Sequence, residues 1–187
     1  QISLVGSEVP ARALVPSNGN LGMTWMQPDF DDSGWLSGQT GVGYDRNATY
    51  RDLINLDVRS RMENENTTCF IRVPFTLEAG ASVSGLLLRM KYDDGFIAFV
   101  NGQRIAGGNA PEGNGSWNTT ATSLHDDGEA VEFVDFTVAG GANSLRDGEN
   151  VLAIIGLNDN LGSSDFVILP ELVGFDAGEL NRDEMLY

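Results

Sequence analysis

The chain has 187 residues, 41% of them hydrophobic and 20% charged, which is the composition of a folded domain rather than of a disordered segment. Its 27 acidic and 11 basic residues give a formal net charge of −16, which argues against nucleic acid and anionic membranes as partners. No apolar run approaches the roughly 20 residues that span a bilayer. The single cysteine, Cys69, excludes an intrachain disulfide and is expected in the core.

Alternation of apolar and polar residues predicts short strands along most of the chain. In residues 67–77, every second side chain from Cys69 to Phe75 is apolar, which predicts a strand with one buried face. Pro74 lacks an N–H group and therefore predicts a sheet edge or a bulge at that point. The other predicted strands are residues 84–92, 96–100, 103–106, 132–138, 150–157 and 166–175.

Two of these runs, 96–100 and 150–157, are apolar on both faces, which predicts central strands. Asn101-Gly102 predicts a hairpin between the first of them and the strand that follows. Residues 28–66 and 107–128 are predicted to be long loops, which are often functional. Short strands with glycine-rich turns and almost no helical periodicity predict an all-β protein, an antiparallel β-sandwich.

Three phrases, in order along the chain, carry a family resemblance. They are WMQPDFDDSGW (25–35) with GVGY (41–44), then YDDGFIAFVNGQRI (92–105), then NVLAIIGL (150–157). Residues 25–173 resemble galactose-binding-like jelly-roll modules, which include non-catalytic carbohydrate-binding modules and the sugar-binding domains of β-galactosidase and β-glucuronidase relatives. The resemblance implies a jelly-roll fold. It does not specify a ligand, because the fold also occurs in adhesion modules and spacers.

The expected organisation is a single module, 1–175, followed by 176–187 as a C-terminal tail or the start of a linker. The resemblance is greatest to modules of large secreted bacterial proteins with several domains. We therefore expect a secreted, extracellular location and neighbouring domains of the same chain as partners.

Many modules of this family hold a structural calcium ion between an early loop and the last strand. The residues that correspond here are Asp29, Asp31, Asp32, Thr40 and Glu171. Carboxylate and hydroxyl oxygens are suitable calcium ligands. The alternative is a solvated acidic turn in which Asp31 or Asp32 caps backbone amides.

Asp93-Asp94-Gly95 precedes a strongly apolar strand and allows two interpretations. As a tight turn, the aspartates accept local N–H bonds and the glycine supplies a positive φ angle. PA14-like domains have a similar Asp-Asp-Gly, whose carboxylates hold a calcium ion that in turn binds sugar hydroxyls. This local resemblance makes Asp93 and Asp94 an alternative calcium site, while the rest of the chain favours the turn.

Sugar binding requires an exposed aromatic face and fixed polar groups. Trp117 is the main candidate because no core pattern accounts for it, although it could instead cover a sheet edge. Tyr44 is a second aromatic candidate that could equally be a packing residue. Five polar candidates complete the predicted carbohydrate-binding set, namely Asn109, Asn118, Asn158, Asp159 and Asn160.

Catalytic motifs are not found in the sequence. There is one histidine, His125, and no nucleophile elbow, zinc-binding or phosphate-binding pattern. We therefore expect a non-catalytic carbohydrate-binding module that recognises a polysaccharide or oligosaccharide. The alternative is a structural or adhesion spacer without a sugar site.

Overall fold

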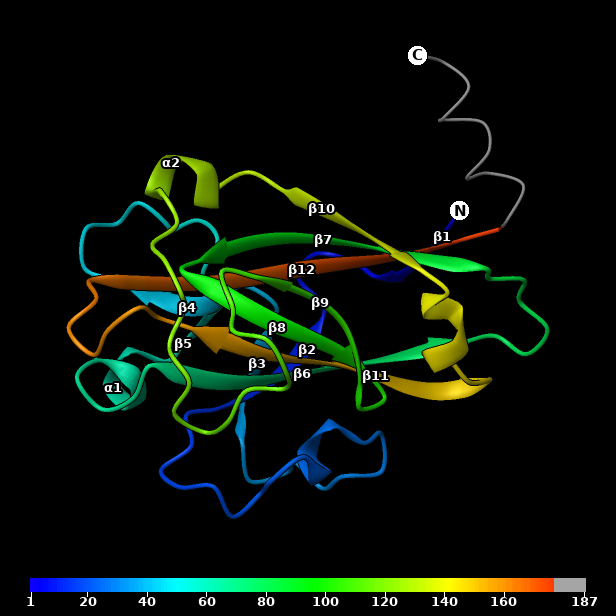
Figure 1. Cartoon of the computed structure of the whole chain (residues 1–187), viewed down its shortest axis with the longest axis horizontal. Coiled ribbons are helices and arrows are strands. Elements are labelled where there is room, and N and C mark those ends of the chain that lie inside the picture. The colour runs from blue at the N-terminus through cyan, green and yellow to red at the C-terminus, as the bar shows by residue number, and fades with distance from the viewer. Residues whose placement is uncertain (177–187) are drawn as a thin grey trace.

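The computed structural model describes residues 1–176 and shows two packed β-sheets (Figure 1). The first sheet has the strand order β10 (Val134–Ala139), β7 (Gly85–Asp93), β12 (Asp165–Phe175), β4 (Val42–Asp45) and β5 (Leu56–Asp57), with β1 (Ile2–Val5) also paired to β12. The second has the order β3 (Leu36–Gln39), β2 (Pro10–Leu14), β6 (Thr68–Leu77), β11 (Gly148–Leu157), β8 (Gly95–Val100) and β9 (Gln103–Gly108). We call them sheet A and sheet B.

Helices are short in the described part of the chain. They are η1 (Thr24–Met26), α1 (Arg59–Met62), α2 (Asp127–Ala130) and η2 (Gly141–Ser144). None of the helices in residues 1–176 has the length and apolar character needed to cross a membrane. The strand pairs are antiparallel except β4 with β5, which confirms the predicted antiparallel sandwich. Residues 177–187, predicted as a tail, lie outside the described residues.

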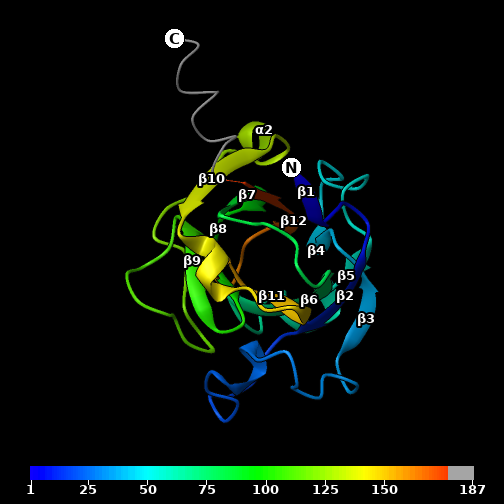
Figure 2. The ribbon, with the colours of Figure 1, turned by 90° about the vertical axis from the view of Figure 1, so that its right-hand side faces the viewer.

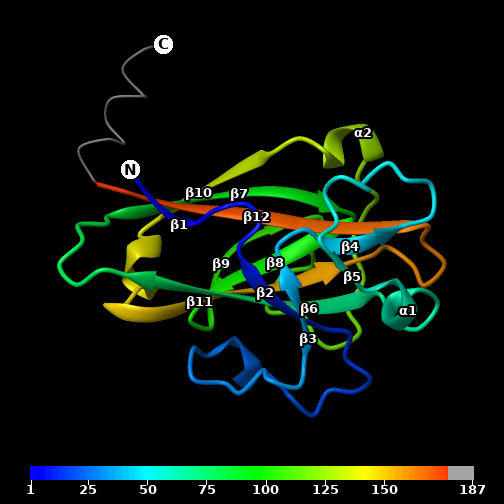
Figure 3. The same cartoon turned by 180° about the vertical axis from the view of Figure 1, so that it is seen from behind.

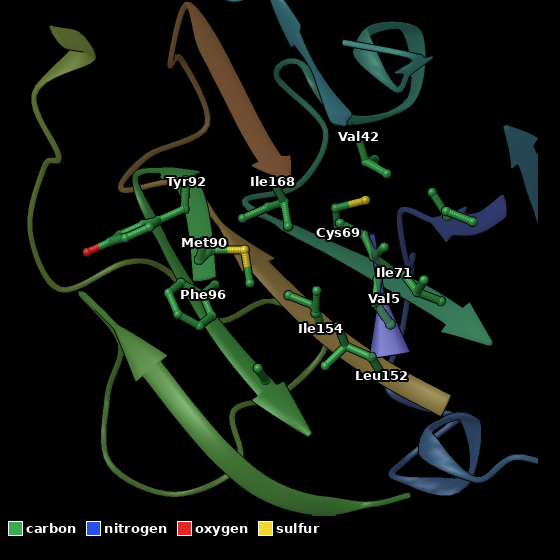
Figure 4. Close-up of a cluster of buried hydrophobic side chains, with 14 of the residues drawn as sticks. Val5, Val42, Cys69, Ile71, Met90, Tyr92, Phe96, Leu152, Ile154 and Ile168 are labelled. Atoms are coloured by element: carbon green, nitrogen blue, oxygen red, sulfur yellow. The ribbon is translucent and has the colours of Figure 1, made fainter. Parts of the chain in front are cut away.

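The main core lies between the two sheets (Figures 2 and 4). Alternating side chains of β6, β7, β11 and β12 meet there, including Ile71, Met90, Ile154 and Ile168, each 0% exposed. Cys69 is also fully buried in this core, as predicted, and burial raises the pKa of its thiol. The period-two pattern read from the sequence therefore identified the inner faces of the long strands correctly.

The outer face of β6 is also buried, which corrects the predicted strand with a single buried face. Phe70 and Arg72 point to this side and are each 3% exposed. Residues 15–35 pass beneath sheet B and cover it, as Figure 3 shows from behind. A second apolar cluster forms in this layer, in which the Trp25 ring stacks on Phe70 with centroids 4.3 Å apart.

Arg72 fixes this covering segment to sheet B. Its guanidinium donates to the backbone oxygens of Trp25 and Gln27 and to the Asp32 carboxylate, the last at 2.6 Å. The Arg72 side chain is only 4% exposed, so this ion pair is largely shielded from water. A buried cation of this kind requires its partners, because an unpaired charge in the interior is costly.

The long predicted loop at 28–66 contains β3, β4, β5 and α1, which corrects that expectation. These strands have two to four residues and are rich in glycine, so they show too little alternation to be recognised. Gly43 illustrates the reason for a glycine here, since a Cβ at this position would lie 2.2 Å from the Phe166 oxygen of the neighbouring strand.

The predicted hairpin at Asn101-Gly102 joins β8 to β9, and both residues have positive φ angles of 51° and 85°. The Asn101 side chain also donates to Ser144 O and Asn150 Oδ1 and accepts from Val151 N. Pro74 is expected at an edge or bulge. It lies in β6, two residues past Arg72, which is the last residue of β6 that pairs with β2. The N–H group that Pro74 lacks is therefore not needed for hydrogen bonds between β6 and β2.

Replacing Asp32 by alanine should lower the free energy of unfolding by roughly 3–5 kcal/mol, because it leaves the Arg72 guanidinium buried without its carboxylate. Urea denaturation measures the loss. Asp31→Ala is the matched control and should cost much less, because Asp31 is exposed and its carboxylate accepts a bond only from the nearby Ser33 amide. Equal losses for the two neighbours would contradict the role given to Arg72.

Candidate functional site

An open acidic pocket of about 650 Å³ lies at the end of the sandwich where β12 begins. Three chain segments meet there (Figure 1): the β7–β8 junction, the β11–β12 loop and the start of α2. Six aspartates and no lysine or arginine line it, the full set being Asp93, Asp94, Leu124, His125, Asp126, Asp127, Asp159, Asn160, Gly162, Ser163, Ser164 and Asp165. We call this the acidic pocket.

Asp94 stands where the chain passes from sheet A to sheet B. Its carboxylate accepts the backbone N–H groups of His125, at 3.2 Å, and Asp159, at 2.9 Å. Its own backbone oxygen accepts from the Asn109 side chain at 2.9 Å. Asp94 thus accepts backbone N–H bonds, as the turn interpretation of Asp-Asp-Gly requires, and it also holds two loops around the pocket. The predicted positive φ at Gly95 is wrong; the glycine is needed because a Cβ there would lie 2.7 Å from the Asn109 oxygen.

Asp93 ends β7 and is 2% exposed. Burial raises the pKa of its carboxyl to about 8, and the charges of Asp94 and Asp165 act in the same direction. The Tyr50 hydroxyl donates to Asp93 and opposes part of this effect. Burial also raises the pKa values of Asp94 and Asp165. The pocket therefore gathers carboxyl groups whose ionised forms the protein itself compensates poorly.

Three of these carboxylates are close enough to bind one metal ion. An oxygen from each of Asp93, Asp127 and Asp165 lies within 4.8 Å of the others. Asp93 and Asp165 are buried, whereas Asp127 is exposed at the first position of α2. A cluster of carboxylate oxygens is the donor set that hard cations such as calcium require. The residues present therefore fit a metal ion.

The other predicted calcium set, in the early loop, is not assembled. The Asp32 carboxylate pairs with Arg72 and Arg12, so guanidinium groups occupy the position expected for the metal. Glu171 pairs in the same way with Arg89, at 2.7 Å, and accepts from the Ser7 hydroxyl.

The remaining members of that set offer no site either. The Thr40 hydroxyl is buried and accepts from Val9 N, while Asp29 and Asp31 lie exposed on the surface. The structure therefore moves the candidate metal site from the early loop to the acidic pocket. Of the predicted metal residues, the alternative pair of Asp93 and Asp94 is the one found there.

The predicted sugar-binding residues do not lie together at one site. Asp159 and Asn160 line the acidic pocket, and Asn109 binds Asp94 beside it. Tyr44 and Asn158 are each 1% exposed and hydrogen-bond to one another at 3.1 Å, so their role is in the core. This corrects both assignments, since a buried ring offers no face to a sugar.

Trp117 and Asn118 lie in the loop between β9 and α2, which runs from the acidic pocket to the outer face of sheet B. Trp117 is partly buried and packs on the second apolar cluster, and Asn118 is exposed. The Trp117 ring lines a small cleft beside Phe70 and residues 18–23. Trp117 thus covers sheet B and also borders an open surface.

Asp127 and Asp165 complete the metal cluster, although no motif in the sequence singles them out. Asp127 occurs in an acidic turn that resembles several others in the chain. Asp165 is the first residue of a strand, directly after Ser163 and Ser164, and no spacing links it to Asp93. Asp165 is placed near Asp93 by the pairing of β12 with β7, in which Val167 lies opposite Asp93, whereas Asp127 comes from the separate segment that begins α2.

The two sheets and their strand order define the class of the fold, an antiparallel β-sandwich. No family model matches the sequence, and no curated protein matches it. Among solved structures, the chain is similar to β-glucuronidase 2 of Bacteroides uniformis, with a TM-score of 0.55 and 14% identity over 94% of this chain.

A second similar structure is a B. uniformis β-glucuronidase, with a TM-score of 0.53 and 14% identity over 92% of this chain. A third is a β-glucuronidase of an uncultured Clostridium species, with a TM-score of 0.51 and 9% identity over 94% of this chain. The match covers 18% of each Bacteroides chain and 29% of the Clostridium chain. The chain therefore spans less than a third of the length of these larger enzymes, and the likeness is one of fold.

The acidic pocket should make stability depend on pH when metal is removed with EDTA. The Asp93 pKa of about 8 in the folded state exceeds the value of about 3.9 in unfolded chains, so only the folded state keeps the proton between these values. The free energy of unfolding should therefore fall as pH rises from about 4 to about 8. Denaturant titrations at a series of pH values measure this slope.

Asp93→Asn should make that slope shallower, because the amide does not titrate. Asp29→Asn, at an exposed site on another loop, should keep the wild-type slope. Stability that rises with pH across this interval would contradict the description of Asp93 as a buried, poorly compensated carboxyl.

Proposed function

We propose that the chain is a non-catalytic carbohydrate-binding module whose acidic pocket binds a glycan through a calcium ion. The observation that supports this most is the set of Asp93, Asp127 and Asp165 oxygens within 4.8 Å of one another in an open pocket. A bound calcium would be held by these carboxylates and would supply free coordination positions for vicinal sugar hydroxyls.

The remaining groups of the pocket are suited to orient a sugar. Asn160 and Asp159 lie at its wall and are joined by a hydrogen bond of 2.6 Å. Leu124, which is 72% exposed, also lines the pocket and offers apolar surface to the C–H face of a ring. Polar groups for hydroxyls next to apolar surface are the usual combination in small-ligand sites.

The hydrogen bonds of the pocket favour binding over catalysis. A glycosidase requires one carboxyl that donates a proton and a second that faces it across the sugar. Here Asp94 already accepts two backbone N–H groups, and Asp93 accepts the Tyr50 hydroxyl. Asp94 is thus used to hold two loops in place, which suits a binding pocket.

We further propose that the module belongs to a secreted protein with several domains, where it holds an attached enzyme near a polysaccharide. The match to less than a third of the β-glucuronidase chains supports a role as one domain among several. The net charge of −16 favours neutral glycans over acidic ones, since an anionic ligand would be repelled at long range.

Calcium should raise the melting temperature of the wild-type chain relative to EDTA, because an ion that binds only the folded state stabilises it. At a concentration of 100 times the dissociation constant the gain is about 2.7 kcal/mol. Asp127→Asn should remove most of this gain, since Asp127 is the exposed member of the cluster and its loss should not disturb the core. Differential scanning calorimetry gives the comparison.

Asp29→Asn is the matched control, because Asp29 belongs to the early loop that lacks an assembled site. It should respond to calcium as the wild type does. Two results would overturn the metal site in the acidic pocket. One is a wild-type melting temperature that calcium does not change, and the other is a calcium-induced rise that only Asp29→Asn removes.

Glycan binding should follow the same dependence. Pull-down on insoluble neutral polysaccharides whose sugars carry no methyl group should retain the wild type in calcium and release it in EDTA, and Asp127→Asn should remain unbound in both. Failure to bind any polysaccharide with calcium present would leave the spacer function as the better description of the chain.

A further inference from the structure

A second surface feature, separate from the acidic pocket, is the cleft beside Trp117. It has a volume of about 150 Å³ and lies between residues 18–23 and the loop that carries Trp117, with Phe70 at its base. Its lining comprises Asn18, Gly19, Leu21, Gly22, Met23, Phe70, Gly115, Ser116 and Trp117, none of which is charged. An engineered apolar cavity of about this volume takes up benzene, a six-membered ring.

The walls of the cleft are held together by hydrogen bonds. The side-chain amide of Asn66 is buried and donates to Pro16 O, at 2.6 Å, and to Trp117 O, at 2.9 Å, which ties the two loops to each other. A Cβ at Gly19 would lie 3.0 Å from the Trp117 ring, so the glycine allows the first loop to contact the indole. The cleft is thus formed before any ligand arrives.

The surroundings of the cleft do not suit an anion. The nearby Arg72 guanidinium is committed to Asp32 and to backbone oxygens under the covering segment. Arg104, near the other loop, donates to the Pro111 and Gly113 oxygens. A carboxylate placed in the cleft would therefore find no cation among the lining residues and would meet the field of a chain with net charge −16.

The apolar base distinguishes a methyl group from a hydroxymethyl group. A methyl on Phe70, Leu21 and Met23 removes apolar surface from water. A hydroxyl in the same place would lose its hydrogen bonds to water without replacement. Asn18 and Ser116 supply polar groups beside the apolar surface, where the remaining hydroxyls of a sugar ring would lie.

We propose that the Trp117 cleft is a second sugar subsite, independent of metal, that selects a neutral sugar carrying a methyl group. The methyl belongs either to a 6-deoxyhexose or to an N-acetyl substituent, and the same apolar base receives it in both cases. The proposal rests on the proposed function in so far as the chain is a sugar-binding module. It differs in requiring no calcium and none of the pocket aspartates.

The test uses the whole chain in EDTA, with indole N–H resonances of its three tryptophans followed by NMR during titration. One arm compares L-fucose with L-galactose, which differ by the 6-hydroxyl alone. The other compares N-acetylglucosamine with glucose, and glucuronate serves as the anionic probe. In at least one arm the methyl-bearing sugar should bind about ten-fold tighter than its partner and shift the Trp117 signal. Glucuronate should give no shift.

Two variants separate the cleft from the rest of the molecule. Met23→Asp places a carboxylate at the rim, on a side chain already 38% exposed, and should weaken binding at least ten-fold without lowering the melting temperature. Trp117→Ala should abolish binding. Asp127→Asn, in the acidic pocket, should bind methyl-bearing sugars in EDTA as the wild type does.

Equal affinity within both matched pairs, or tighter binding of glucuronate, would overturn the proposed selectivity. If polysaccharide binding depends on calcium and no sugar shifts the Trp117 signal, the Trp117 cleft is not a sugar subsite, while the proposed function stands. Absence of sugar binding both with calcium and with EDTA would overturn both proposals.

Discussion

The burial of sheet B on both faces is the constraint on which the surface features depend. Its inner face packs against sheet A, while Phe70, Ile97 and Ile155 on the outer face also require cover. Residues 15–35 and the loop between β9 and α2 supply that cover. Since both segments are held by packing and by buried hydrogen bonds, the cleft between them has fixed walls.

The loop between β9 and α2 connects the two candidate binding places. One part of it carries Asn109 and His125 against Asp94, and another part carries Trp117 against residues 18–23. Between them, Thr119 O accepts the hydroxyls of Thr67 and Thr68 on the start of β6. A change that loosened the middle of this loop would therefore disturb the acidic pocket and the Trp117 cleft together.

Regular alternation explains which features the sequence could predict. The long strands, the hairpin at Asn101 and the sandwich class follow from local patterns, and the structure confirms them. The metal cluster could not be predicted, because Asp165 reaches Asp93 only through the pairing of β12 with β7, and Asp127 comes from a third segment, the start of α2. The early-loop aspartates were misjudged for a related reason: composition cannot show that Arg72, a partner 40 positions away, already neutralises Asp32.

The pairing of β1 with the far end of β12 affects how the module could be built into a larger protein. Ile2 lies opposite Gly174, whereas the acidic pocket surrounds the beginning of β12 at Asp165. Both ends of the described chain are therefore on the side of the sandwich remote from the pocket (Figure 1). Inserted into a longer polypeptide at these points, the module would be attached on one side only, and its acidic end would face outward.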